Sequence, residues 1–345
     1  DRLRGRGVPG GERRQRGQRP YVDAVRDEET GVTALLMAVR QGHEEVAACL
    51  LRAGADPDRG RADNNESPVC AASSRGHAGL VRLLVAARAD VDQATHPTGQ
   101  TPLLEATAGG HVECVRVLLE ARAQVQGGLG CGNTPLWAAI ERRDNDILHL
   151  LLTARADPNS SIGMIGASVL VMACHHKNTT AVRLLLEAGA DANSHIGPGK
   201  ASGLAVACIN GSQDIAQLLL EHQSDPQHIV EGINSGYSKF SLLQLACAHG
   251  HAGIAQLLLD ARADIDYQVP ASGDTALHMA IAAANADCVQ LLLRQGADVG
   301  LRNAKGLGVA HACCCLPYAA PLLLPLLEAR ADPTPATKAG YTPLA

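Results

Sequence analysis

The chain contains very few aromatic residues. Phenylalanine, tryptophan and tyrosine make up 2% of its 345 residues, whereas hydrophobic residues of all kinds make up 46%. A core with so few aromatic rings must pack mainly with leucine, valine and alanine. We therefore expect an aliphatic interior, and an exposed aromatic side chain becomes informative.

Complete catalytic and cofactor motifs are also missing. The segment HEEVA at 43–47 begins like a zinc-protease motif, but Ala47 stands where the second histidine is required. The segment SHIGPGKAS at 194–202 is similar to a phosphate-binding loop, yet Ser194 replaces its first glycine and Ala201 its magnesium-binding hydroxyl. We therefore expect no enzyme activity, no catalytic residues and no cofactor.

A repeated tetrapeptide is the first positive feature of the sequence. ARAD occurs at 87–90, 154–157, 261–264 and 329–332, and ARAQ occurs at 121–124, at intervals of 34, 33, 107 and 68 residues. These intervals correspond to one, one, three and two copies of a unit of about 34 residues. Each unit has an anchor residue at its start, and the anchors are Thr33, Ser67, Thr101, Thr134, Ser168, Ser202, Ser241, Thr275, Gly308 and Thr342.

Each unit of this length has the features of two short helices. A threonine or serine anchor can cap the first helix, and the proline that follows at 102, 135 and 343 suits the first helical position. Glycine at 42, 76, 110, 211 or 250 ends that helix, and a leucine-rich second helix follows. The ARAD segment then ends the second helix, and about ten residues form a hairpin-like finger.

Arginine replaces glycine at several of the second-helix exits, at positions 88, 122, 155, 262 and 330. If these residues are left-handed, each substitution costs about 1 kcal/mol relative to glycine. The alternative is a different local geometry at these exits. Pro325 is expected inside the second helix of the ninth unit, where an interior proline costs about 3 kcal/mol.

The best copies identify a family. GVTALLMAVRQGHEEVAACLLRAGADPD at 31–58 and GDTALHMAIAAANADCVQLLLRQGADVG at 273–300 resemble the ankyrin repeat, which has a G-x-T-P-L-H-x-A, G-H and L-L-x-x-G-A-D pattern. The resemblance implies an α-solenoid of helix-turn-helix repeats with hairpin-like fingers, comprising about nine repeats and a truncated tenth over residues 21–345. The histidine of T-P-L-H remains only as His278 and His311, so the polar link it provides in the family is expected to be mostly absent.

Cysteines recur at one position of the repeat. Cys174, Cys208, Cys247 and Cys314 each lie six residues after an anchor. Neighbouring helices are about 8–10 Å apart, beyond the reach of a disulfide, so we expect small core residues in a reducing, intracellular compartment, cytoplasmic or nuclear. His311, Cys314 and Cys315 share a helix face, but they leave a fourth zinc ligand unsupplied, and we expect no metal site.

Two segments lie outside the regular pattern. Residues 1–20 carry seven arginines, which we interpret as a disordered Arg/Gly-rich leader, with an RNA-binding or nuclear-targeting arm as the alternative. Residues 307–327 form a segment without a formal charge, and this segment is long enough for a membrane span. Three prolines and the continuing repeat register favour a damaged ninth repeat there.

The resemblance implies a protein–protein interaction scaffold that binds a protein partner on the concave face formed by the fingers and first helices. The alternative is a region that selects substrates or partners for a larger enzyme or channel, since the chain lacks an initial Met and stops inside a repeat. Nucleic acid and membrane are not the expected partners, because the repeats are mildly acidic and their register is unbroken. We expect a monomer.

The expected concave positions change in character along the chain. In repeats one to four they are largely charged: Glu29, Arg40, Gln41, Asp63, Glu66, Arg75, Glu141 and Arg142. In repeats five to seven they become apolar, aromatic or histidine, and we predict a partner site there, comprising Met164, Ile165, His175, His176, Ile209, Tyr237, Phe240 and His249. Two readings stay open: a contiguous binding patch whose affinity changes near pH 6–7, or aromatic side chains that only pack their own long finger.

Overall fold

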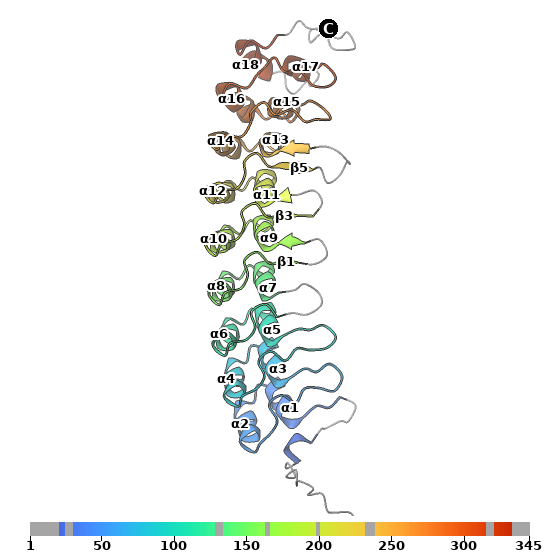
Figure 1. Cartoon of the computed structure of the whole chain (residues 1–345), viewed down its shortest axis with the longest axis vertical. Helices are drawn as coiled ribbons and strands as arrows, with labels where there is room; N and C mark the ends of the chain where they lie inside the picture. Colours follow the sequence, from blue (N-terminus) through green and yellow to red (C-terminus); the bar gives the residue numbers. More distant parts are fainter. Residues whose placement is uncertain are drawn as a thin grey trace, which may run out of the picture. The chain divides into compact units, whose positions relative to one another are not determined.

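The computed structural model describes residues 21–24, 30–127, 134–162, 166–197, 201–231, 239–314 and 321–332. The chain divides into two compact units, residues 1–123 and residues 124–345. Each unit is a stack of helix pairs, with the first helices in one column and the second helices in another (Figure 1). The fingers leave the stack on the side of the first helices.

The N-terminal unit contains three helix pairs among its described residues. A short 3-10 helix, η1 (Tyr21–Asp23), packs against the first pair. The pairs are α1 (Ala34–Arg40) with α2 (Glu44–Arg52), α3 (Pro68–Ser74) with α4 (Ala78–Ala86), and α5 (Pro102–Gly109) with α6 (Val112–Glu120).

The C-terminal unit contains six helix pairs within the described ranges. They are α7 (Pro135–Arg142) with α8 (Asn145–Thr153), α9 (Val169–His175) with α10 (Thr179–Glu187), α11 (Gly203–Asn210) with α12 (Gln213–Glu221), α13 (Leu242–Ala248) with α14 (Ala252–Asp260), α15 (Ala276–Ala282) with α16 (Ala286–Arg294), and α17 (Val309–Cys314) with α18 (Leu323–Glu328). Three fingers form antiparallel hairpins: β1 (Ser161–Ile162) with β2 (Ala167–Ser168), β3 (His195–Ile196) with β4 (Ala201–Ser202), and β5 (Ile229–Glu231) with β6 (Lys239–Ser241).

The serine and threonine anchors cap the first helices, as the sequence predicts. The hydroxyl of Thr33 accepts a hydrogen bond from the Leu36 N–H at 3.2 Å, and Ser202 accepts one from the Ala205 N–H at 3.2 Å. The same contact occurs at Ser67, Thr101, Thr134, Ser241 and Thr275, and Ser168 caps the N–H of Leu170. These caps satisfy helix N–H groups that have no partner within the helix.

The core is aliphatic. Leucine, isoleucine, valine, alanine and cysteine from both helices of every pair are buried, and Leu84 and Leu258 are fully inaccessible to solvent. Trp137, Phe240 and Tyr267 are each only half-buried. The low aromatic content therefore reflects a core built from side chains that fit the close spacing of stacked helices.

The arginines at the second-helix exits are left-handed. Their φ angles are +63° at Arg88, +64° at Arg122, +65° at Arg155, +67° at Arg262 and +66° at Arg330. Glycine occupies the same backbone conformation at Gly54, Gly189 and Gly296. The alternative of a different exit geometry is therefore wrong, and these arginines carry the strain of a Cβ atom in a left-handed residue.

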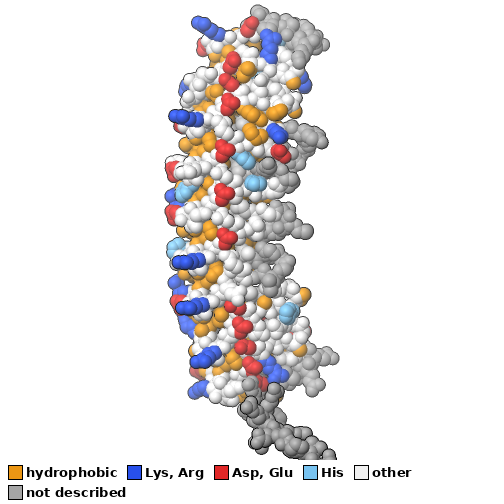
Figure 2. Space-filling model, in the orientation of Figure 1, with side chains coloured by type: hydrophobic (Ala, Val, Ile, Leu, Met, Phe, Trp, Pro, Cys, Tyr) orange, Lys and Arg blue, Asp and Glu red, His pale blue; other side chains and the backbone are white. Residues whose placement is uncertain are grey.

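Carboxylate and amide side chains connect successive repeats at the start of each finger. Asp58 Oδ1 accepts from the N–H of Asp90 at 2.6 Å in the N-terminal unit. In the C-terminal unit, Asn159 Oδ1 accepts from the N–H of Asp191 at 2.7 Å. Figure 2 shows acidic side chains that follow one another along the visible face of each unit, between its two columns of helices.

A glutamine replaces one missing histidine of the T-P-L-H pattern. Gln244 is completely buried, and its Oε1 accepts from the Ser241 N–H at 2.9 Å. Its Nε2 donates to the carbonyls of Tyr267 and Asp274, each at 2.9 Å. His278 makes the corresponding link to the Leu307 carbonyl at 3.2 Å. An amide can supply the same donor and acceptor, so the polar link is present in a repeat where it was expected to be absent. His311, where the link was expected, has no hydrogen-bond partner for either ring nitrogen among the described residues.

The last helix pair corrects two expectations. Pro325 is the third residue of α18, in the first turn, where a backbone N–H would have no helical partner. The proline therefore shortens the helix rather than interrupting it. Cys314 is exposed at the end of α17, whereas Cys174, Cys208 and Cys247 are buried. Cys313 is the buried cysteine of α17, so Cys314 is not a core residue.

The uncharged segment 307–327 contributes to both α17 and α18, and these helices have six residues each. Among the described residues, no helix is long and apolar enough to cross a membrane. The described part of this segment therefore contains no helix that could form the membrane span considered as the alternative.

Candidate functional site

The first helices of the C-terminal unit expose one face of each helix. The positions four, seven and eight residues after the anchor lie on that face, because side chains at i, i+3 and i+4 are neighbours on a helix. In α9 these positions hold Met172, His175 and His176. Ser168, Ser202, Ser241 and Thr275 are buried in the stack, as are the positions one, two and five residues beyond each of them.

An uncharged surface runs over four successive first helices, α9, α11, α13 and α15, which pack against one another in that order. We call it the inner surface. Its central row is apolar and half-buried, and the flanking positions are alanine, isoleucine, asparagine and histidine. The central residues are Met172, Val206, Leu245 and Met279, and the flanking residues are His175, His176, Ile209, Asn210, Ala248, His249, Ala282 and Ala283.

The central row was missed by the sequence analysis, which considered only the finger residues and the ends of the first helices. The signal was nevertheless present, since the position four residues after each anchor lies one helical turn before the position eight residues after it. Ile209, which the sequence analysis did select, is 41% exposed beside this row. An apolar side chain this exposed marks a surface that another molecule can cover.

The histidines of the inner surface have defined neighbours. His175 and His176 meet edge to face, with ring centroids 5.7 Å apart. His176 Nε2 lies 3.8 Å from Glu141 Oε1, so the two form an ion pair when the histidine is protonated. His249 Nδ1 donates to the carbonyl of Leu245 at 2.8 Å, which fixes its ring against α13.

The finger residues of the predicted site are only partly visible. Phe240 lies on β6 opposite Val230 of β5 and is half-buried. Met164, Ile165 and Tyr237 lie outside the described residues. The structure therefore brings His175, His176, Ile209 and His249 to one face of the first helices and places Phe240 on the neighbouring hairpin.

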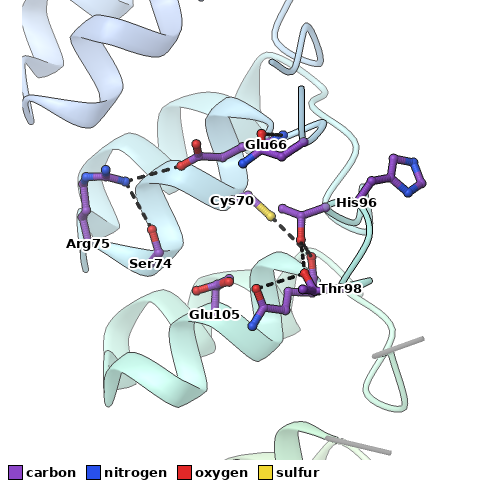
Figure 3. Close-up of a pocket in the computed structure, with 10 residues that line it drawn as sticks. Glu66, Cys70, Ser74, Arg75, His96, Thr98 and Glu105 are labelled. Atoms are coloured by element: carbon purple, nitrogen blue, oxygen red, sulfur yellow. Dashed lines mark hydrogen bonds and ion pairs between the residues drawn. The ribbon is translucent and has the colours of Figure 1, made fainter. Parts of the chain in front are cut away.

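A polar cavity of about 630 Å³ opens in the N-terminal unit (Figure 3). It lies between the finger that precedes α3, the finger that precedes α5, and the exposed faces of these two helices. Its lining residues are Asn64, Glu66, Cys70, Ser74, Arg75, Thr95, His96, Thr98, Gln100 and Glu105. The sequence analysis treated Glu66 and Arg75 as solvated charges and did not predict this cavity.

The charged groups of this cavity are unequally paired. Glu66 forms ion pairs with Arg40 and with Arg75, whose NH1 lies 3.6 Å from Glu66 Oε1. Glu105 has neither a hydrogen-bond partner nor an ion-pair partner among the described residues. Burial raises the pKa of Glu105, and repulsion by Glu66 raises it further, while Arg75 acts in the opposite direction.

The thiol of Cys70 also faces this cavity but is chemically inert. Burial raises the pKa of Cys70 to about 12, and the charge of Glu105 adds to this effect. The thiol therefore remains protonated at neutral pH and is a poor nucleophile. Its Sγ lies 3.6 Å from the carbonyl oxygen of Gln93 and 3.8 Å from that of Gln100, and it also interacts with the side chain of Ser67.

Metal and nucleotide sites find no support in the described ranges. No group of three or more histidine, cysteine, aspartate or glutamate side chains there is arranged to hold a metal ion. His311 is buried and Cys314 is exposed, while Cys315 lies outside the described residues. Within the segment 194–202, His195 and Ile196 of β3 pair with Ser202 and Ala201 of β4.

Comparisons with known proteins agree with this architecture. A family model of ankyrin repeats in three copies matches residues 20–95, 69–162, 161–230 and 227–303. Among solved structures, the chain is similar to the ankyrin repeat domain of Bcl-3, a unique member of the IkappaB protein family. The two share 29% identity and a TM-score of 0.54, over 62% of this chain and 94% of that chain. Comparison with curated proteins gave no match.

Proposed function

The chain belongs to the ankyrin repeat family, whose domains mediate protein interactions, and on that premise we propose that it is a scaffold that binds a protein partner on the inner surface of its C-terminal unit. The observation that carries this proposal is the row of Met172, Val206, Leu245 and Met279, which is apolar, half-exposed and free of formal charge at its flanking positions. Burial of such a row against a partner removes apolar area from water, the main favourable term in protein association.

The composition of this surface fits a protein rather than a charged ligand. Methionine side chains adapt to irregular partner surfaces because they are unbranched and polarizable. The cores of protein interfaces are depleted of charged residues and rich in apolar ones, while their rims are polar. His175, His176 and His249 occupy one edge of the row, where Glu141 supplies the nearest carboxylate.

The test introduces charge into the centre of the row. The double variant Val206→Glu with Leu245→Glu places two carboxylates where the proposal requires apolar contact. We expect it to lose at least about 100-fold in affinity, since each buried unpaired charge costs several kcal/mol. The measurement is quantitative pull-down from native extract with wild type and variant, followed by titration of the captured protein.

The matched control is Gln213→Glu with Gln217→Glu, which adds the same charge to the exposed side of α12. It should bind the partner as wild type does. Circular dichroism must show the same helix content in all three proteins. If the double variant at 206 and 245 keeps every partner at unchanged affinity, the inner surface is not the binding site.

A further inference from the structure

The cavity of the N-terminal unit contains a carboxylate that lacks a counter-ion. Glu66 already has two counter-ions, because Arg40 and Arg75 both form ion pairs with it. Glu105, on the facing helix α5, has no such partner in the described part of the chain. A half-buried carboxylate without a partner has lost part of its hydration and gained nothing in return.

The cation nearest to Glu105 is already engaged. Arg75 NH1 lies 3.3 Å from the carbonyl oxygen of Ala71, 3.3 Å from Ser74 Oγ and 3.6 Å from Glu66 Oε1. Glu66 and Glu105 are the two carboxylates of the lining, and Arg75, its one guanidinium, lies against Glu66. Glu105 is therefore the lining carboxylate that remains for a cation from outside.

The remaining lining groups of the cavity supply oxygen atoms. Thr98 Oγ1 contacts both Thr95 Oγ1 and Gln100 Oε1, at 3.1 and 3.3 Å. Figure 3 shows the ring of His96 turned away from Glu105, so this histidine does not serve as its counter-ion. Hydroxyl and amide oxygens accept hydrogen bonds from an ammonium or guanidinium group.

We propose that this cavity receives the basic side chain of a protein partner, a lysine or an arginine, with Glu105 as its counter-ion. The cavity is open at the fingers and first helices, so a side chain that projects from a partner's surface can enter it. The aliphatic stem of such a side chain packs between the two fingers while its charged end reaches α5. The proposal relies on the proposed function only for the delivery of this side chain by a protein.

The test uses small analogues of these side chains, so its outcome does not depend on any protein partner. The experiment uses the full chain, which is labelled with ¹³C at its glutamate side chains. n-Butylammonium stands for lysine, n-propylguanidinium for arginine, and n-butanol is the uncharged control, all at constant ionic strength. The shift of the Glu105 carboxyl carbon is followed during titration.

We expect a saturable shift with one or both cations and none with n-butanol, together with a fall in the pKa of Glu105 when the cation is bound. Glu105→Gln should weaken the saturable binding at least about tenfold, seen in the amide shifts of Cys70 and Thr95, because a charge-assisted hydrogen bond is lost. Glu113→Gln, at an exposed glutamate of α6, should leave binding unchanged.

Three results would each overturn the proposal. They are a shift that does not saturate with either cation, equal shifts with n-butanol, or unchanged binding by a folded Glu105→Gln protein. The n-butanol comparison uses only wild type, so the proposal remains testable if the variant fails to fold. The signals that are followed come from Glu105, Cys70 and Thr95 of the N-terminal unit and not from the inner surface, so failure here leaves the proposed function intact.

Discussion

The first helices α1 and α3 of the N-terminal unit carry charged side chains at positions where α9, α11, α13 and α15 of the C-terminal unit carry none, although α7 of that unit still has Glu141 and Arg142 there. Four residues after the anchor, the N-terminal unit has Met37, Ala71 and Glu105, whereas the C-terminal unit has an apolar row centred on Val206 and Leu245. Seven and eight residues after the anchor, the N-terminal unit has charged side chains such as Arg40 and Arg75, whereas the α9–α15 helices have none.

This contrast shows which positions the fold constrains. Anchors and their buried neighbours keep the same character in both units, because they cap helices and fill an aliphatic core. The partly exposed positions contribute little to the stack, and substitutions there usually change stability by less than about 0.5 kcal/mol. They are therefore free to differ, and each unit can present a different surface on the same backbone.

The largest expected effect concerns the position three residues after the anchor. In the C-terminal unit, Gln244→Leu removes three buried hydrogen bonds and leaves the Tyr267 and Asp274 carbonyls without this donor. We expect a loss of about 3 kcal/mol in the free energy of unfolding, measured by urea denaturation. In the N-terminal unit, Cys70→Leu should cost less than about 1 kcal/mol, because the Cys70 thiol makes only long contacts. Equal losses in the two variants would show that the glutamine contributes no special polar link.

The residue that follows the first helix should also behave differently in the second and fourth repeats. At Gly76, φ is +76° and an added Cβ would lie 2.6 Å from His111 Nδ1 of the next repeat. Gly76→Ala should therefore cost about 2 kcal/mol, from strain and from displacement of the histidine. The equivalent residue of the fourth repeat is Arg143, with φ +57°, and the next repeat offers Asn178, which donates to Asn145.

Arg143→Gly should raise the free energy of unfolding by up to about 1 kcal/mol, because it relieves left-handed strain without a neighbouring histidine to consider. Thermal unfolding of the Gly76→Ala and Arg143→Gly proteins measures both changes in stability. A Gly76→Ala protein as stable as wild type would show that the histidine contact does not require glycine.

The left-handed arginines provide a smaller effect. Arg122→Gly in the N-terminal unit should stabilise by about 0.5–1 kcal/mol, and Gly189→Arg in the C-terminal unit should destabilise by a similar amount. Arg122→Ala is the control, since alanine keeps the Cβ atom and so should give no comparable gain. If Arg122→Ala stabilises as much as Arg122→Gly, the cost comes from the guanidinium and not from the backbone.

The smallest expected effect is the pH dependence of Glu105. Its pKa in the folded chain is raised above 4.5, so the folded state binds more protons than the unfolded state just above pH 4.5. Stability is therefore lost as the pH rises from 4.5 through the folded pKa. Glu105→Gln should make the N-terminal unit slightly more stable than wild type at pH 7, and the difference should shrink below pH 4. Melting temperatures of both proteins across this range measure it, and a difference that grows as the pH falls would contradict the assignment.

The repeating pattern of the sequence predicted most of the backbone. A serine or threonine hydroxyl caps the adjacent helix whatever the rest of the chain does, so anchors such as Thr33 and Ser202 revealed where first helices begin. The ARAD segments revealed where second helices end, because only a left-handed residue closes them in this way. Pro325 was expected in the interior of its helix but lies in the first turn, since a proline in the sequence does not by itself indicate which turn it occupies.

The sequence by itself determined the family, the helix pairs, the aliphatic core and the difference in charge between early and late repeats. All of these follow from side-chain chemistry that acts within one repeat or between neighbours at a fixed spacing. Only the tertiary structure decided that Glu66 takes two arginines and leaves Glu105 unpaired across the cavity, and that Gln244 binds two carbonyls of the next finger. Those contacts join residues of different repeats, so they depend on how adjacent helices and fingers are positioned, which the spacing of residues along a chain does not specify.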